Sequence, residues 1–155
     1  MIHSRIAPVL FIAILLTVAP PDARAQQKGF GLGVVLGEPT GFSFKGWIDS
    51  RSAIDAGLAW SFLHETTFHV HVDYLMHTGE LTKRAEMPAY YGIGGRIKAG
   101  GIGADRIGIR VVGGLVYFVP GSPVDIFCEI APILDVAPST DFQINGGIGA
   151  RYFFN

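Results

Sequence analysis

Three side chains able to bind a metal ion or move a proton alternate along one short segment: His69, His71 and Asp73. In an extended strand, alternate residues share one face and lie ~7 Å apart. Two imidazoles and a carboxylate in that arrangement can bind zinc, but they also serve as ordinary polar packing inside a protein. We expect the packing role, with no bound metal and no cofactor.

Ser61 adds a hydroxyl group to this set. With His69 or His71 as the base, and with Asp73 or Glu129 as the acid, it has the side-chain types of a hydrolytic triad. The residues around Ser61 form no nucleophile motif, however, and the candidate side chains all fall on the same polar faces as the other charges. We therefore expect no catalytic residues.

The segments that carry these residues alternate apolar and polar side chains with a period of two, which is typical of β-strands. Turn residues separate the runs. The pattern predicts eight strands, at residues 29–37, 42–48, 53–62, 67–77, 89–98, 106–119, 124–136 and 141–154. The even number and the short connections predict an all-β fold, an antiparallel up-and-down barrel.

One face of each predicted strand is apolar, and the other is polar but rich in glycine. In residues 67–77, for example, Phe68, Val70 and Val72 alternate with His69 and His71. A soluble sheet alternates too, so a soluble barrel with an apolar interior is the alternative. The polar faces carry only one or two charges each, which is too few for a solubilising surface. We therefore predict a transmembrane barrel whose apolar side chains face lipid and whose charges face the lumen.

Composition agrees with this prediction. Hydrophobic residues make up 49% of the chain and charged residues only 16%, which is apolar for a soluble domain of 155 residues. The net charge of −1 gives no electrostatic footprint for nucleic acid. Cys128 is the single cysteine, so the chain has no internal disulfide framework.

Twelve ionisable residues fall on the predicted inner face: Lys45, Asp55, His69, His71, Asp73, Arg96, Lys98, Arg110, Asp125, Glu129, Asp135 and Arg151. Apart from the histidines, five are positive and five are negative. Because an unpaired buried charge costs several kcal/mol, we predict that ion pairs fill the lumen. The expected pairs join Arg96, Arg110 and Arg151 to Asp73, Asp125 and Glu129, in an order that the sequence leaves open.

The first 25 residues have the features of a removable secretion signal. A short basic start at His3 and Arg5 precedes an almost wholly apolar run at 6–19, which is too short to span a bilayer as a helix. The sequence Ala23-Arg24-Ala25 then supplies the small-x-small pattern of a cleavage site. We predict cleavage after Ala25 and a single barrel domain over residues 26–155.

The last predicted strand contains Gly149 followed by aromatic residues at alternate positions, Tyr152 and Phe154. In this motif and in its alternating pattern the chain resembles small bacterial outer-membrane β-barrel proteins of the class of the OmpA membrane domain. The resemblance implies an outer-membrane location, with membrane lipid and the barrel-assembly machinery as partners, since this motif is the assembly signal of the class. Asn155 departs from the pattern, which usually ends on phenylalanine.

The lengths of the connections depart from the class as well. With a periplasmic N-terminus, the longest connection, at residues 78–88, would lie on the periplasmic side, whereas barrels of this class usually have their long loops outside. Either part of this stretch extends the flanking strands, or the predicted register is shifted by one element.

These observations predict a non-catalytic outer-membrane barrel with a charged, side-chain-filled lumen and a structural role in the envelope. A narrow channel or a carrier of small ligands is the alternative. A lipid-modifying enzyme is a third and less favoured function.

Overall fold

The computed structural model describes residues 28–61, 66–79, 81–84, 86–101, 103 and 105–154, so the predicted signal peptide at 1–25 and Asn155 lie outside the described residues. The described chain forms eight strands: β1 (Phe30–Glu38), β2 (Thr40–Trp47), β3 (Ser52–Ser61), β4 (Thr67–Thr78), β5 (Ala89–Ala99), β6 (Arg106–Phe118), β7 (Val124–Ala137) and β8 (Asp141–Phe154). No helix long and apolar enough to cross a bilayer occurs in this part of the chain.

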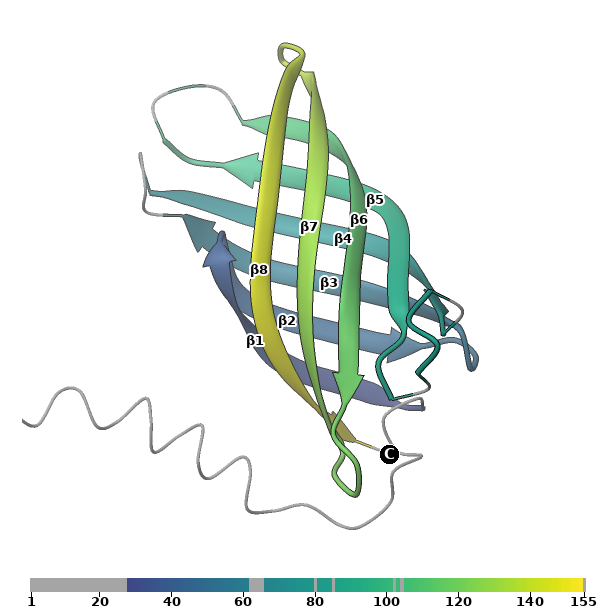
Figure 1. The fold of residues 1–155 in the computed structure, drawn as a ribbon. Coiled ribbons are helices and arrows are strands. Elements are labelled where there is room, and N and C mark those ends of the chain that lie inside the picture. Colours follow the sequence, from purple (N-terminus) through teal and green to yellow (C-terminus); the bar gives the residue numbers. More distant parts are fainter. Residues whose placement is uncertain are drawn as a thin grey trace, which may run out of the picture.

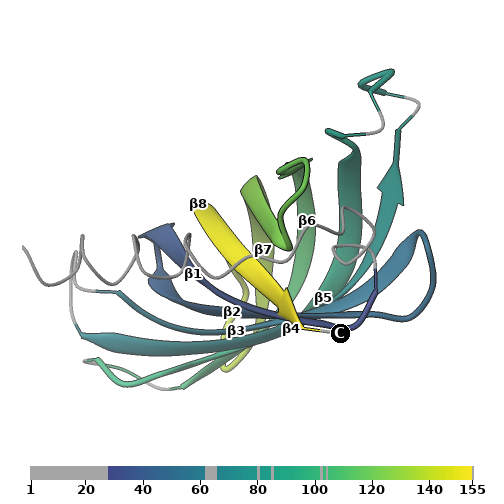
Figure 2. The ribbon, with the colours of Figure 1, turned by 90° about the horizontal axis from the view of Figure 1, so that it is seen from below.

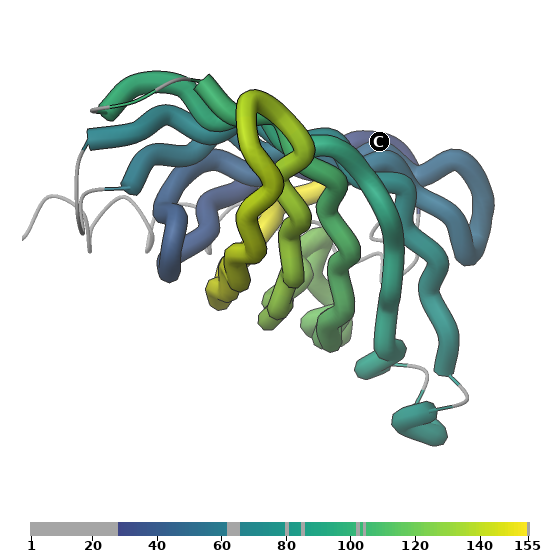
Figure 3. The backbone as a smooth tube through the Cα atoms, turned by 90° about the horizontal axis from the view of Figure 1, so that it is seen from above, coloured from purple at the N-terminus to yellow at the C-terminus, as the bar shows by residue number. Residues whose placement is uncertain are grey.

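Each strand pairs antiparallel with its neighbour in sequence, and β1 pairs with β8 to close the barrel. The predicted all-β, up-and-down barrel of eight strands is therefore confirmed. The strands are strongly tilted, so that β6, β7 and β8 run steeply in front of the more transverse β2, β3 and β4 (Figure 1). Seen from below (Figure 2) and from above (Figure 3), the strands follow one another in sequence order around the wall.

The two ends of the barrel differ in their connections. Phe30 at the start of β1 pairs with Phe154 at the end of β8, and we call this side the terminal end and the opposite side the distal end. The longest connection, between Thr78 and Ala89, lies at the terminal end and projects from the barrel (Figure 2). Of the two explanations suggested by the sequence, a shifted register is wrong, because the order of the strands is as predicted. The stretch does extend its neighbours in part: Thr78 belongs to β4, and the backbone oxygens of Glu86 and Pro88 accept hydrogen bonds from Phe118 and Val116 of β6.

Burial alternates along the strands as the sequence predicts, with apolar side chains on the outer face of the barrel and charged side chains on the inner face. Exposed large apolar side chains cover the outer wall on every strand, for example Leu32, Phe42, Val72 and Ile93. Charged residues with almost no exposed surface lie between them on the inner face, among them Arg96 at 1%. The small interior of an eight-stranded barrel is thus filled by side chains.

Part of this filling is apolar, which the sequence analysis did not predict. The buried cluster contains Leu75, Tyr90, Val112, Val116, Phe118, Phe127 and Ala131, and Val35 and Trp47 pack against it. Several members, including Tyr90 near the start of β5 and Phe118 at the end of β6, come from the terminal-end parts of their strands. The signal was available, because Val112, Val116 and Phe118 are an even number of residues from Arg110 and so share its face.

Candidate functional site

Arg110 on β6 forms the central ion pairs of the lumen. Its Nε donates to Asp73 Oδ2 at 2.7 Å, and its Nη2 donates to Glu129 Oε1 at 2.6 Å. The hydroxyl of Tyr90 donates to the other oxygen of Glu129 at 3.0 Å. Three strands of the wall, β4, β6 and β7, are thereby joined across the interior, with β5 reaching them through Tyr90.

Arg151 on β8 forms a second cluster. Its Nη1 donates to Asp55 Oδ1 at 2.6 Å and to the hydroxyl of Ser43 at 3.4 Å, while its Nε donates to Asp125 Oδ1 at 3.1 Å. The guanidinium carbon also lies 3.9 Å from the centroid of the Phe127 ring, a cation–π contact. Arg151 therefore ties β8 to β3, on the far side of β1 and β2.

Arg96 does not bind any of the three carboxylates named as its expected partners. It donates instead to Asp135 Oδ1 at 2.5 Å and to Gln143 Oε1 at 3.1 Å. The reason is register: Arg96 pairs with Gly108 on β6, and Gly108 in turn pairs with Asp135 on β7. The pair therefore lies in one row across three strands, toward the distal end and away from Arg110.

Glycine makes these rows possible. Strands that are two apart lie about 10 Å from each other, twice the spacing of neighbours, so a side chain must pass over the strand between them. Gly94 lies between Asp73 and Arg110, and Gly114 lies between Tyr90 and Glu129.

Gly94, Gly108 and Gly114 each lie beneath a polar contact between the two neighbouring strands. A Cβ atom at any of them would collide with one of the residues in contact: Asp73 at Gly94, Asp135 at Gly108 and Tyr90 at Gly114. The glycines on the polar face are thus the spacers over which the polar contacts form.

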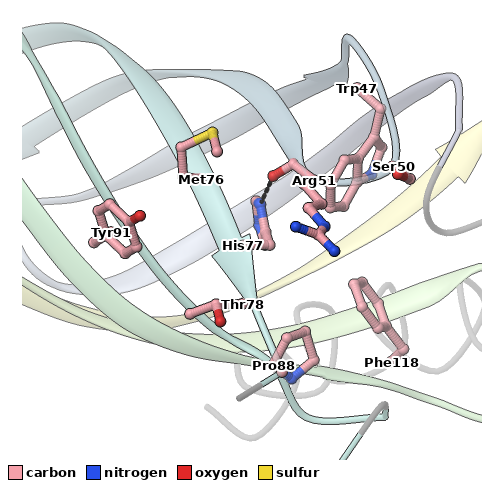
Figure 4. A pocket seen from close by; sticks show the side chains of 10 residues that line it. Trp47, Ser50, Arg51, Met76, His77, Thr78, Pro88, Tyr91 and Phe118 are labelled. Atoms are coloured by element: carbon pink, nitrogen blue, oxygen red, sulfur yellow. Dashed lines mark hydrogen bonds between the residues drawn. The ribbon is translucent and has the colours of Figure 1, made fainter. Parts of the chain in front are cut away.

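Lys45 is fully buried near the terminal end and has a different type of partner. Its Nζ donates to His77 Nε2 at 2.7 Å and lies 4.4 Å from the centroid of the Trp47 ring. His77 is anchored in turn by the backbone oxygen of Arg51, 3.0 Å from its Nδ1 (Figure 4). His77 lies an even number of residues from His69 and so shares its polar face, but it is not among the twelve ionisable residues predicted for the lumen.

A pocket of about 420 Å³ opens above this group at the terminal end. Trp47, Arg51, His77 and Phe118 line it together with residues from the ends of β4 and β5 (Figure 4). Its wall is mixed, because the aromatic rings of Trp47 and Phe118 and the side chain of Arg51 all line it (Figure 4).

The two histidines of the His-x-His-x-Asp segment have separate surroundings. His69 Nε2 lies 3.1 Å from the hydroxyl of Thr67, on the distal side. His71 Nε2 lies 3.9 Å from Asp55 Oδ2 on the neighbouring strand, and with Asp55 and Asp73 it forms a cluster whose ligand atoms are all within 4.8 Å of one another. The group that could hold a metal ion is therefore Asp55, His71 and Asp73, and not the set of His69, His71 and Asp73 considered from the sequence.

Residues of the expected assembly signal lie where the barrel closes. The rings of Tyr152 and Phe154 pack 4.9 Å apart, and Phe154 is half exposed on the outer wall. Gly149 provides space for the ring of Phe127 inside the barrel. Their recognition by an assembly machinery stays a prediction.

Comparison with known proteins finds no matching family model and no matching curated protein. Among solved structures, the crystal structure of the N-terminal β-barrel domain of Pseudomonas aeruginosa OprF is similar, with a TM-score of 0.63 at 10% sequence identity. The match covers 81% of this chain and 95% of that one. The chain shares its fold with the OprF barrel. At this identity the likeness to OprF concerns the fold alone.

The Arg110 contacts predict the effect of removing one charge. Replacing Glu129 by Gln keeps the size of the side chain but removes the negative charge that is paired with the buried Arg110 guanidinium, so we expect ~2 kcal/mol lower free energy of unfolding. Urea unfolding of the barrel in detergent measures this value. Glu86→Gln, in the connection between β4 and β5, is the control and should leave stability unchanged; equal stability of both variants would contradict the network.

The spacer role of glycine predicts a position-dependent effect of one methyl group. Gly108→Ala places a Cβ against the Asp135 carboxylate, so we expect a loss of ~1–3 kcal/mol, typical of overpacking. Gly113→Ala on the same strand is the matched control, because a Cβ there has no neighbouring atom within 4 Å. The same unfolding measurement decides, and equal effects at the two positions would refute the spacer role.

Proposed function

We propose that this chain is a non-catalytic barrel of the bacterial outer membrane that has a structural role in the envelope. The observation that carries the proposal is the combination of an apolar outer wall with a filled, ion-paired interior. Backbone groups in lipid must be hydrogen bonded within the protein, and a closed barrel achieves this without free edges. The fold shared with the OprF barrel supports the same location.

The filled lumen favours a structural role over transport. Arg110 joins β6 to β4 and β7, Arg151 joins β8 to β3 and β7, and the apolar cluster around Val116 fills the space near the terminal end. Both groups would have to move before ions could pass. The predicted leader at 1–25 and the aromatic end of β8 support passage through the inner membrane and assembly in the outer one.

A small-ligand carrier is the second candidate, and the pocket beside Trp47 and His77 is the observation that favours it. The pocket is lined by residues of β2, β4, β5 and β6 and of the connections at the terminal end, and the buried Lys45 lies close to its Trp47 and His77 walls. A ligand bound there would be held at the mouth of the barrel, and the lumen would remain closed behind it.

A charge on the outer wall tests the membrane location. Val111 lies near the middle of β6 with 51% of its surface exposed. In a bilayer, Val111→Arg should lower the free energy of unfolding by ~2–4 kcal/mol, the cost of an arginine near the bilayer midplane. Val111→Leu is the control and should be neutral. A soluble barrel would tolerate the arginine as a surface residue, so an unchanged stability in lipid vesicles would contradict the proposal.

Conductance across a planar bilayer separates the structural role from a channel. We expect the reconstituted mature protein to give no stable unitary current, because paired side chains occupy the lumen. Insertion is verified in the same preparation by protection of the barrel from added protease. Stable unitary currents from the inserted protein would favour the narrow channel instead.

A further inference from the structure

We propose that Asp55, His71 and Asp73 bind one divalent transition-metal ion, with Zn²⁺ as the fitting example, at the centre of the lumen. One imidazole nitrogen and two carboxylate oxygens are donors that zinc accepts, with a fourth position left open for water. The proposal goes beyond the structural role, because it adds a ligand to the barrel interior.

The geometry brings the three donors together from two strands. Asp55 on β3 pairs directly with Asp73 on β4, and His71 precedes Asp73 by two residues on the same face. Their ligand atoms lie within 4.8 Å of one another, and His71 Nε2 is 3.9 Å from Asp55 Oδ2. Ligands around a zinc ion lie about 3–4 Å apart, given bond lengths near ~2.1 Å, so a small change of side-chain torsions closes the set.

Asp73 supplies a second and independent observation. Its exposed fraction is 1%, and its Oδ1 has no hydrogen-bond partner among the described residues. A buried carboxylate oxygen without a partner is costly. A metal ion bound by this carboxylate would remove that cost.

Charge balance in the centre of the lumen also favours a cation. The clusters around Arg110 and Arg151 hold four carboxylates, those of Asp55, Asp73, Asp125 and Glu129. Besides His71, which has to be neutral to bind a metal ion, the cations that face them in the described part of the chain are Arg110, Arg151 and the nearby Lys45. The four carboxylates therefore face three cations, which leaves one negative charge without a counterpart. Asp55 and Asp73 lie side by side in this group, on paired positions of β3 and β4.

The arginines hold the carboxylates in a suitable arrangement. Asp55 gives one oxygen to Arg151 and keeps Oδ2 on the side of His71, while Asp73 gives Oδ2 to Arg110. Carboxylate ligands of metal sites are commonly held in this way by a hydrogen-bonded outer partner. His71 retains 11% of its side-chain surface exposed, so an ion in the lumen can reach it.

The experiment uses untagged mature barrel, freed of metal with a chelator and refolded in detergent, with folding verified by its faster migration on an unboiled gel. Titration with Co²⁺ should produce one visible d–d absorption band that saturates at one ion per barrel, and Zn²⁺ should abolish the band by competition. Zn²⁺ should also raise the unfolding midpoint by a few degrees, because it binds only the folded state.

Variants assign the site. His71→Gln should weaken Co²⁺ binding at least tenfold, and His71→Asn serves the same purpose if the glutamine variant does not fold. His69→Gln is the matched control, since it lies two residues away on the same face but outside the donor set, and it should bind as the wild type does.

Failure of Co²⁺ and Zn²⁺ to bind the folded wild type would overturn the proposal, as would unchanged binding by the His71 variants or a loss caused by His69→Gln. A barrel that folds and inserts but binds no metal refutes only this inference, while a chain that does not insert refutes the proposed function.

Discussion

The structure depends on one constraint: every charge on the inner face of the wall must meet an opposite charge or a hydrogen-bond partner inside a space only a few side chains wide. The Arg110, Arg151 and Arg96 clusters satisfy it along the length of the barrel. Glycine is the geometric condition for this pairing, because the partners often lie on strands that are not adjacent. The polar faces are therefore rich in glycine because the ion pairs need space above the strands that lie between the partners.

The interior is divided between polar and apolar filling. Ion pairs extend from Arg151 and Asp125, near the terminal-end parts of β8 and β7, to Asp135 toward the distal end. The apolar residues Leu75, Tyr90 and Phe118 pack beside them near the terminal end. Lys45 lies at the boundary, where Trp47 and His77 enclose its ammonium group. The apolar part closes the barrel beneath the pocket, and the polar part joins strands that are two or three positions apart around the wall. This combination suits a rigid barrel better than an open pore.

Strand positions and faces could be predicted from the sequence because alternation is a local property. Phe68 and Val72 are exposed and Asp73 is buried, as their period of two predicts. The partner of Arg96 could not be predicted, because Asp135 lies 39 residues away and is reached only through the registers of β5, β6 and β7. The cluster of Asp55 with His71 was missed for the same reason, since it depends on the pairing of β3 with β4. The buried apolar residues of β6, Val112, Val116 and Phe118, could have been predicted from the sequence, because they lie an even number of residues from Arg110 and so share its face.

The central claim is that the apolar wall faces lipid and the charges are enclosed. Electrophoresis of the protein in purified outer membranes, with and without boiling, tests it most directly, because a folded barrel resists detergent until it is heated. We expect the protein in the outer-membrane fraction, and we expect it to migrate faster before boiling than after. Recovery of a monomeric, folded protein in the soluble fraction without detergent would contradict it.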